Sequence, residues 1–302
     1  MASQHTAEVP CGSWDNHIHV FESSKHPYSR NRSCTPGAAP LADYPKNATG
    51  CSNIVAVQAT VQGTNLAALL DTLSLKSPHG GVLRGLGVLD LERVSYDELD
   101  RLHAAGVRGV RMHEVSWGFG DQPSDNAVAE KITYAAQRVN RLGWVIDLYM
   151  HPKAWAALAP TIEAMPPSTK VVADHWAGFR SGGEDGPEFQ VFLGLLRRQR
   201  VYIKLSAFER QYHGNDMGIS SLDNMARAII EAGPNRILFG SDWPNTALAS
   251  DREGRTREER LIIVEDFRKV PHADHVARLR EWIRDEDVWN KFWIDNPAAL
   301  FE

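Results

Sequence analysis

Eight short runs rich in apolar and β-branched residues recur along the chain, and helix-like segments separate them. The runs are WDNHIHV, NIVAVQA, VLRGLGVL, GVRGVRM, GWVIDLYM, KVVADHW, VYIKLSA and RILFGSD. Residues 65–75, 96–106, 125–143 and 221–233 lie between runs, with Ser, Asp or Asn near several starts and Gly at several ends, as helices are commonly capped. Strands that alternate with helices predict a parallel sheet.

The length of 302 residues fits one (β/α)8 barrel, a fold of about 250 residues that tolerates insertions. The first and last runs both end in residues that could build a site, and only closure of the barrel makes those two strands neighbours. An open, doubly wound sheet would leave them far apart. We therefore expect a single domain over residues 1–302, a TIM barrel with its chemistry at the C-terminal ends of the strands.

Four side chains at the ends of these runs are the candidates for a site. His17 and His19 stand two residues apart in the first run, so the period-two pleat of a strand directs both toward one face. The sixth run carries His175 and the eighth ends at Asp242. A single histidine is usually a core or surface residue, but two polar rings in an apolar strand need partners inside the barrel. Asp242 could cap a helix, yet its position after the last strand favours catalysis.

The four groups support two chemistries that the sequence does not separate. His17, His19, His175 and Asp242 could bind one divalent metal, with Zn2+ as the best match, and leave a position open for water. Without a metal, Asp242 would take a proton from water as general base. The imidazoles would then donate hydrogen bonds to the developing oxyanion.

Arginines near the same strand ends indicate an anionic ligand. Arg108 and Arg111 lie in the fourth run. Arg180 follows the sixth run, and Arg210 follows the seventh. A guanidinium group binds a carboxylate through two parallel hydrogen bonds, so we expect a small substrate that bears carboxylate. Polar residues inside apolar runs also need partners in the pocket or the barrel, and these are Gln58, Tyr149, Lys204 and Ser206. Of these we expect Gln58, Tyr149 and Ser206 to bind the substrate, with His113 and His151 as weaker site candidates.

Two segments extend the simple barrel. Residues 22–50 follow the first run and are rich in Pro, Ser, Lys and Arg. A loop of this length is usually functional or mobile, so we expect a lid or pocket wall over the barrel mouth, with a disordered insertion as the alternative. The tail after Asp242 has apolar residues at helical spacing, and we expect extra C-terminal helices that close the barrel and pack its floor. The tail aromatics are expected in the core, namely Trp282, Trp289, Trp293 and Phe301.

Composition excludes several classes of partner. The 33 basic and 38 acidic residues give a net charge of -5 and are spread along the chain, so we expect neither nucleic acid nor a membrane surface as partner. No run approaches the roughly 18 apolar residues of a membrane span, and the N-terminal residues lack the apolar core of a signal peptide, so we expect a cytoplasmic protein. The 3 cysteines form no CxxC pair and fit reduced thiols. The sequence is compatible with a homo-oligomer but does not determine the oligomeric state.

Four motifs in this order resemble a known family. DNHIHVF, ADHWAGF, FGSDWPN and DNPAALF are similar to segments of the amidohydrolase superfamily. They more closely resemble its lactonase-type branch, the amidohydrolase 2 proteins that include 2-pyrone-4,6-dicarboxylate lactonase and sulfomuconolactone hydrolase. The resemblance spans nearly the whole chain. HxH alone is a weak signal, whereas HxH, DH in the sixth run and SDWP after the eighth are specific in combination.

The resemblance implies a (β/α)8 hydrolase that holds one metal or activates water through four residues, which are His17, His19, His175 and, as the base, Asp242. It also implies that substrate carboxylates are held by residues similar to Arg111, Arg180, Arg210 and Tyr149. The spacing from His175 to Arg180 is longer than the usual family pattern. The fifth run has Asp147 and Tyr149 where two-metal members have a histidine, and the fourth run has no lysine, so a two-metal site is not expected.

Three functional hypotheses follow from the four groups. The first is a hydrolase that opens a small carboxylate-bearing lactone or pyrone, in which water attacks the ester carbonyl and Asp242 takes its proton. The alternative is metal-dependent, non-oxidative decarboxylation on the same scaffold, the chemistry of a related branch of the superfamily. The third is a catalytically inactive barrel that only binds a ligand. Such a barrel would be expected to lack one of the four groups, and none is missing.

Overall fold

The computed structural model describes residues 9–45, 49–113 and 124–302. An 8-stranded sheet has the order β1-β3-β4-β5-β6-β7-β8-β9, and all neighbouring strands are parallel. The strands are β1 (Trp14–Ile18), β3 (Asn53–Val57), β4 (Leu83–Gly87), β5 (Val107–His113), β6 (Val145–Tyr149), β7 (Lys170–Ala173), β8 (Val201–Ser206) and β9 (Ile237–Gly240). Each strand coincides with one of the eight predicted runs.

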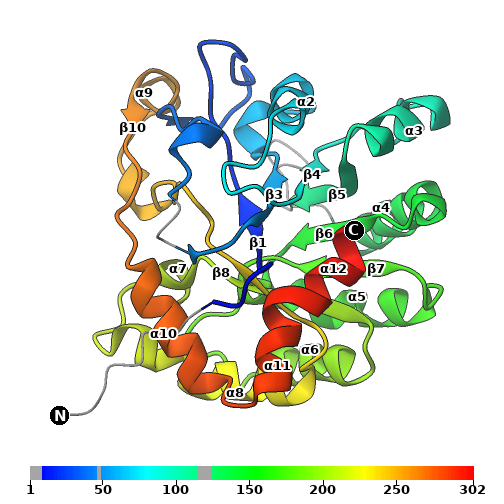
Figure 1. Ribbon diagram of the computed structural model, residues 1–302, viewed down its shortest axis with the longest axis vertical. Coiled ribbons are helices and arrows are strands. Elements are labelled where there is room, and N and C mark those ends of the chain that lie inside the picture. Colours follow the sequence, from blue (N-terminus) through cyan, green and yellow to red (C-terminus); the bar gives the residue numbers. More distant parts are fainter. Residues whose placement is uncertain (1–8, 46–48, 114–123) are drawn as a thin grey trace.

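The sheet closes on itself between β1 and β9. Ile18 forms a parallel bridge with Trp243. The amide of His19 donates to the carbonyl oxygen of Trp243 at 2.7 Å, and the amide of Asp242 donates to that of His17 at 2.9 Å. The prediction of a closed (β/α)8 barrel is confirmed. Helices surround the strands (Figure 1), namely α2 (Ala67–Ser74), α3 (Tyr96–Ala104), α4 (Asp125–Val139), α5 (Pro152–Ala164), α6 (Pro187–Arg197), α7 (Phe208–Tyr212) and α8 (Asp223–Ala232).

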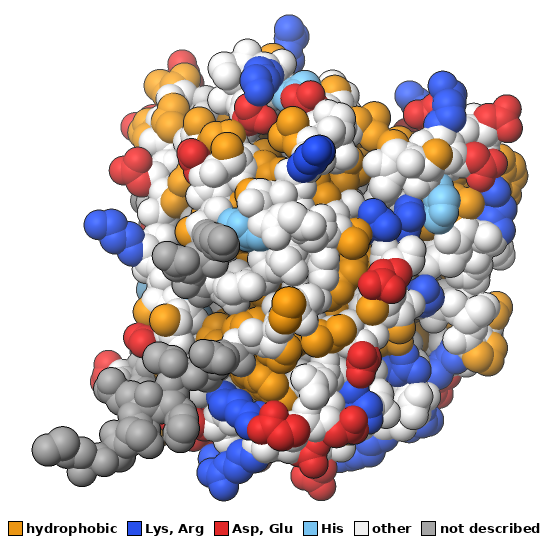
Figure 2. All heavy atoms as spheres, in the orientation of Figure 1, with side chains coloured by type: hydrophobic (Ala, Val, Ile, Leu, Met, Phe, Trp, Pro, Cys, Tyr) orange, Lys and Arg blue, Asp and Glu red, His pale blue; other side chains and the backbone are white. Residues whose placement is uncertain are grey.

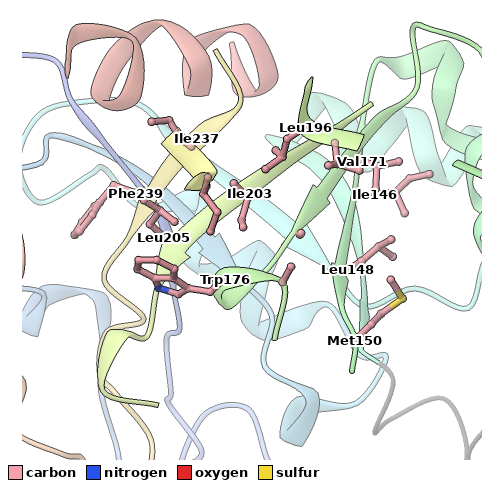
Figure 3. Packing of buried hydrophobic residues seen from close by; sticks show 14 of the residues in the cluster. Ile146, Leu148, Met150, Val171, Trp176, Leu196, Ile203, Leu205, Ile237 and Phe239 are labelled. Atoms are coloured by element: carbon pink, nitrogen blue, oxygen red, sulfur yellow. The ribbon is translucent and has the colours of Figure 1, made fainter. Parts of the chain in front are cut away.

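Alternate residues of each strand face opposite sides of the barrel wall. Those on the outer face pack with the helices in one apolar cluster (Figure 3). Examples are Ile146, Leu148, Ile203, Leu205 and Ile237. Residues of the opposite phase form a second apolar cluster inside the barrel, which includes Val145, Val172, Leu238, Trp14 and Phe301. The same alternation directs Asp147 and Lys204 into the barrel interior. Both are fully buried, so charges lie inside this barrel next to the apolar layer.

The C-terminal tail packs the floor of the barrel, as predicted. Helices α10 (His272–Trp282), α11 (Glu286–Asn290) and α12 (Asn296–Phe301) lie together in the orange and red part of Figure 1. Nδ2 of Asn296 donates to the carbonyl oxygen of Ile237 at 2.9 Å, and the ring of Phe301 lies 6.1 Å from that of Trp14. The predicted core aromatics are all buried, that is Trp282, Trp289, Trp293 and Phe301.

The segment after β1 packs against a distant part of the chain. β2 (Thr35–Pro36) runs parallel to β10 (Val264–Glu265), and Phe21 bridges Ala39. Phe21, Cys34 and Ala39 are buried in a small apolar cluster of their own. The described part of this segment is therefore a packed wall and not a disordered insertion. Residues 46–48, which the predicted lid includes, lie outside the described residues.

In the part of the tail that starts at residue 257, the predicted helical spacing holds only as far as residue 262. α9 (Arg257–Ile262) ends there, and the chain continues in extended conformation into β10. Ile262, Ile263 and Val264 are β-branched, a residue type that favours extended backbone, and β10 is fixed by pairing with β2. Ile262 and Val264 are 69% and 64% exposed, so this stretch is not part of the barrel floor.

Acidic and basic side chains are interspersed over the face shown in Figure 2, in agreement with the even charge distribution of the sequence. Of the helices in the described part of the chain, none has both the length and the apolar character needed to cross a bilayer. Cys11, Cys34 and Cys51 are free thiols, as predicted.

Candidate active site

The four predicted groups converge at the C-terminal end of the barrel. His17 lies in β1 and His19 just after it, while His175 follows β7 and Asp242 follows β9. The Nε2 atoms of His17 and His19 are 3.3 Å apart. Oδ1 of Asp242 lies 3.5 Å from Nε2 of His19 and 3.8 Å from Nε2 of both His17 and His175. All four side chains are buried, so they form one compact centre.

Each imidazole is held through its Nδ1 atom. The partners of His17, His19 and His175 are, in turn, Oδ1 of Asp174 at 3.1 Å, the carbonyl oxygen of Val57 at 2.7 Å and Oγ of Ser206 at 2.7 Å. A carboxylate or carbonyl oxygen only accepts, so the first two bonds favour a hydrogen on Nδ1. The Nε2 lone pair then faces the centre, the usual orientation of a metal-binding histidine.

The turn that carries His175 has an unusual backbone. The φ angles of His175, Trp176 and Ala177 are 50°, 58° and 55°, in the left-handed region that residues with a Cβ rarely adopt. Gly178 continues the turn, and a Cβ there would lie 2.5 Å from the carbonyl oxygen of Met150. Such strain persists where the surrounding structure holds it, and it is concentrated at functional sites. The HWAG sequence thus forms a tight turn that positions His175 in the barrel mouth.

Asp242 is fixed both by its own loop and by β1. Its φ angle is 58°, and its carbonyl oxygen accepts from the amide of Asn245 at 2.7 Å. The buried carboxylate of Asp15 accepts from the amide of Ser241 at 2.9 Å and from the hydroxyl of Tyr44 at 2.7 Å. β1 therefore supplies the histidine pair and also anchors the loop that carries the carboxylate.

Burial sets the charge states of the centre. It lowers the pKa of His17 and His175, and that of His19 to about 4, because a charged imidazole would lose its hydration. Burial would raise the pKa of Asp242, but His175 and Arg210 beside it outweigh this effect and hold that pKa below its usual range. Near neutral pH the centre therefore contains neutral imidazoles and an ionised carboxylate.

A layer of buried charges lies behind the centre. The sequence predicts substrate binding for Arg111 and a partner for Lys204, but it does not predict that these side chains meet in one layer. Nζ of Lys204 lies 2.6 Å from Oδ1 of Asp147, 2.9 Å from Oδ1 of Asp174 and 3.3 Å from Nδ1 of His17. Nε of Arg111 lies 3.3 Å from Oδ2 of Asp174. Asp174 adjoins His175 in the sequence, and this adjacency is the one feature of the sequence that could have marked Asp174 as a site residue. Only the packing of β6, β7 and β8 shows that these charges meet.

Arg210, Tyr149 and Arg180 line a cavity of about 1240 Å³ beside the centre. Nε of Arg210 lies 3.5 Å from Oδ2 of Asp242, and the ring of Tyr149 lies 5.2 Å from that of His175. Arg180 is exposed at the rim. The cavity thus meets the centre at Arg210 and Tyr149, whereas the four central side chains are not among its lining residues.

Three of the predicted substrate-binding residues are engaged by the protein itself. The side-chain amide of Gln58 bonds three backbone groups of the loops after β3 and β4. Ser206 bonds an imidazole of the centre, and the buried Arg111 bonds a carboxylate behind it. The structure therefore places Ser206 and Arg111 next to the centre and ties the Gln58 side chain to backbone.

The two weaker candidates and the remaining arginine lie at opposite ends of the barrel. The ring of His113 lies 4.8 Å from that of Tyr149, and His151 lines the cavity, so both lie at the barrel mouth. Arg108 donates to two carbonyl oxygens at the N-terminal end of β5, the opposite end of the barrel from the centre.

The donor set of the centre matches the needs of a divalent cation. Neighbouring ligand atoms of a tetrahedral zinc lie about 3.3–3.5 Å apart, given bonds of about 2.0–2.1 Å. The facing atoms of His17, His19 and Asp242 are separated by 3.3, 3.5 and 3.8 Å. With the hydrogens on Nδ1, these atoms are all acceptors, so their mutual repulsion is relieved by a cation between them. The facing atoms of His17, His19 and Asp242 therefore fit one Zn2+, and Nε2 of His175 lies 3.8 Å from the Asp242 oxygen of this set.

Comparison with known proteins gives one family and several close relatives. The family described as amidohydrolase matches residues 7–302. A 2-pyrone-4,6-dicarboxylate hydrolase of Comamonas testosteroni is 31% identical over 306 residues, which cover 97% of this chain and 91% of the relative. A 4-sulfomuconolactone hydrolase of Rhizobium radiobacter is 28% identical over 299 residues, which cover 97% of this chain and 91% of the relative.

A solved structure shares the same fold. It is a probable 2-pyrone-4,6-dicarboxylic acid hydrolase from Acinetobacter baumannii with citric acid bound. The TM-score is 0.72 at 23% sequence identity, and the match covers 96% of this chain and 99% of the other. This likeness extends over the whole barrel.

Proposed function

This chain belongs to the amidohydrolase family, and from that premise we propose that it is a hydrolase that opens a small carboxylate-bearing lactone or pyrone. One observation carries the proposal. An ionised carboxylate, Asp242, faces three imidazoles through Oδ1 and the guanidinium of Arg210 through Oδ2, beside a cavity large enough for a small molecule. The names of two relatives, a pyrone dicarboxylate hydrolase and a sulfomuconolactone hydrolase, support a cyclic ester as the substrate class.

Asp242 is the general base in this proposal. A water oxygen forms a bond to the ester carbonyl carbon, one water proton passes to the Asp242 carboxylate, and the carbonyl π electrons move onto oxygen. Collapse of this oxyanion breaks the ring C–O bond. The leaving oxygen takes the proton from Asp242, which restores the base and releases the ring-opened acid. The lowered pKa of Asp242 keeps it ionised, as a base must be at neutral pH.

One Zn2+ would be held by His17, His19, His175 and Asp242. When bound, it would polarise the ester carbonyl and lower the pKa of the attacking water. Without a metal, the imidazoles would stabilise the oxyanion by donating from Nε2, which requires the hydrogen on that atom. The bonds that Asp174 and Val57 accept from Nδ1 of His17 and His19 favour the opposite tautomer, and so they support metal binding.

Arg210, Arg180 and Tyr149 are the proposed contacts of the substrate. Arg210 is paired with Asp242 at 3.5 Å, and a substrate carboxylate would offer its guanidinium a second, two-oxygen partner. Arg111 lies behind the centre, where its positive charge would attract an anionic ligand. After burial, this charge is the next cause of the lowered pKa of His19. We propose that Gln58 and Ser206 support the loops and the imidazole beside the substrate and do not contact it, because hydrogen bonds within the protein hold both side chains.

The proposal is tested by ring opening, followed by ultraviolet absorbance, of a panel of carboxylated lactones and pyrones. Purified protein of known zinc content is compared with Asp242→Asn and with Asp216→Asn, an exposed carboxylate as matched control. We expect Asp242→Asn to lower kcat by about 10²–10⁴-fold, the usual contribution of a general base, and the control to be unchanged. Full turnover by Asp242→Asn would refute the assignment of the base. Release of CO2 without ring opening would identify the enzyme as a decarboxylase instead.

A further inference from the structure

Two opposite charges meet at the same nitrogen of His17. Oδ1 of Asp174 lies 3.1 Å from Nδ1 of His17, and Nζ of Lys204 lies 3.3 Å from it. Lys204 also lies 2.9 Å from Oδ1 of Asp174 and 2.6 Å from Oδ1 of Asp147. The exposed fraction of all four side chains is 0%, so no solvent screens these contacts.

This buried lysine is not explained by the packing of the barrel. Taking an ammonium ion and a carboxylate out of water costs several kcal/mol for each ion, and an apolar side chain of the same length would fill the volume of Lys204 without that cost. The partner carboxylate is also incompletely satisfied, since Oδ2 of Asp147 has no hydrogen-bond partner among the described residues. The position of the charge relative to His17 is therefore the feature that needs an explanation.

Asp174 and Lys204 have opposite effects on His17 as a ligand. Asp174 accepts from Nδ1–H, which leaves the Nε2 lone pair directed at the centre and makes it more basic. If Lys204 donates to Nδ1 instead, the hydrogen lies on Nε2 and that atom cannot bind a metal. If it does not donate, its positive charge still repels a cation at the centre. Either way, Lys204 opposes metal binding while Asp174 promotes it.

We propose that Lys204 is a positioning residue that lowers the affinity of the centre for a divalent cation by competing with Asp174 at Nδ1 of His17. The balance between these two buried side chains then sets how tightly the four central groups hold zinc. The inference concerns zinc binding and not turnover, so it stands or falls separately from the proposed lactone hydrolysis.

The test compares zinc affinities of folded variants by competition with a chromophoric chelator, with ZnCl2 as the probe. Lys204→Met keeps the length of the side chain and removes its charge, and we expect it to bind zinc roughly tenfold more tightly than the native protein. Asp174→Asn replaces the charged acceptor with a neutral amide, which is a poorer acceptor, and should bind zinc about 10–100-fold more weakly. Lys170→Met removes a lysine at the N-terminal end of β7, bonded to the Ala299 carbonyl, and should leave the affinity unchanged.

If Lys204→Met does not fold, a second variant tests the same proposal. The pair Asp147→Asn with Lys204→Met removes both buried charges together, and it should also bind zinc more tightly than the native protein. Near-ultraviolet circular dichroism establishes that each variant retains its tertiary structure. Equal or weaker zinc binding by the folded Lys204 variants would overturn the proposal, as would the absence of measurable binding in native protein and variants alike.

Discussion

The orientation of each central imidazole depends on one partner behind it, and Ser206 is the partner whose role can be isolated most cleanly. Ser206→Ala removes the oxygen that lies 2.7 Å from Nδ1 of His175, and with it the hydrogen bond that holds the ring. We expect kcat to fall about 10–100-fold with KM changed by less than about twofold, because the ring and not the substrate loses a contact. Steady-state kinetics on a lactone that the native protein opens provides the measurement.

The matched control is Ser74→Ala, which removes a serine that bonds the Asp71 carbonyl on the protein surface. Its kinetic constants should equal those of the native protein. A rise in KM at constant kcat for Ser206→Ala would show instead that Ser206 contacts the substrate directly, as the sequence analysis expected.

At this scale the sequence could predict the four central groups and little of what supports them. His17, His19 and Asp242 each end or interrupt an apolar run, and that position marks them without any knowledge of neighbouring strands. Asp174 and Lys204 are also visible as polar residues in apolar surroundings. Their contact, however, depends on the register of three strands and on which phase of each pleat faces inward, and neither is fixed by local sequence.

Among the secondary-structure elements, β9 packs closely against β1 because it ends in glycine. A Cβ on Gly240 would lie 2.8 Å from Cβ of His17 and 3.0 Å from Cβ of Ser206. We expect Gly240→Ala to destabilise the protein by about 1–3 kcal/mol, the usual cost of overpacking, and to displace His17 so that turnover falls. The free energy of unfolding in urea measures the first effect.

Gly194→Ala is the control, and its effect on the free energy of unfolding should have the opposite sign. Gly194 lies inside α6, where an added Cβ would meet only the end of the Arg198 side chain, at 3.2 Å, and this long side chain can move away. Alanine in a helix interior should stabilise the protein by about 0.5–1 kcal/mol. If Gly240→Ala were as stable as the native protein, the close approach of β1 and β9 would not hold.

The wall formed by β2 and β10 depends on one buried carboxylate. The two paired strands have two residues each, too short to be stable alone, and Glu265 in β10 accepts from Arg252 at 2.9 and 2.8 Å and from Arg255 at 3.3 Å. Glu265→Gln should weaken these bonds, because a neutral amide is a poorer acceptor for guanidinium. We expect limited proteolysis between residues 250 and 265 to become several-fold faster than in the native protein.

Glu258→Gln, an exposed glutamate in α9, should leave the cleavage rate unchanged. An equal rate for Glu265→Gln and the native protein would mean that apolar packing alone holds the wall. This wall is also where prediction from the sequence was poorest. Two-residue strands carry no periodicity, and their pairing joins segments near opposite ends of the chain, so only tertiary structure reveals it.

For the molecule as a whole, stability in mild acid depends on histidines that are buried away from the centre. His275 in α10 is 2% exposed, and its ring stacks on that of Phe208 at a centroid distance of 4.7 Å. Its Nδ1 lies 3.5 Å from Oε1 of Glu209. Burial, followed by the charges of His272 and Arg268, lowers the pKa of His275 to about 3. The packing of α10 on the barrel therefore requires a neutral ring.

Replacing that ring with phenylalanine should make stability less sensitive to acid. His275 has a pKa of 6.5 when unperturbed and about 3 in the folded protein, so the unfolded chain binds more protons, and stability is complete above pH 6.5 and declines as the pH falls toward 3. Between about pH 7.5 and 5.5 this histidine accounts for a loss of about 1.4 kcal/mol, which His275→Phe avoids while keeping the aromatic contact with Phe208. Urea unfolding at both pH values tests this, with His213→Phe, at an exposed position, as control. Equal losses in native protein and His275→Phe would mean that the folded protein protonates His275 as readily as the unfolded chain does, and α10 would then not need the neutral ring.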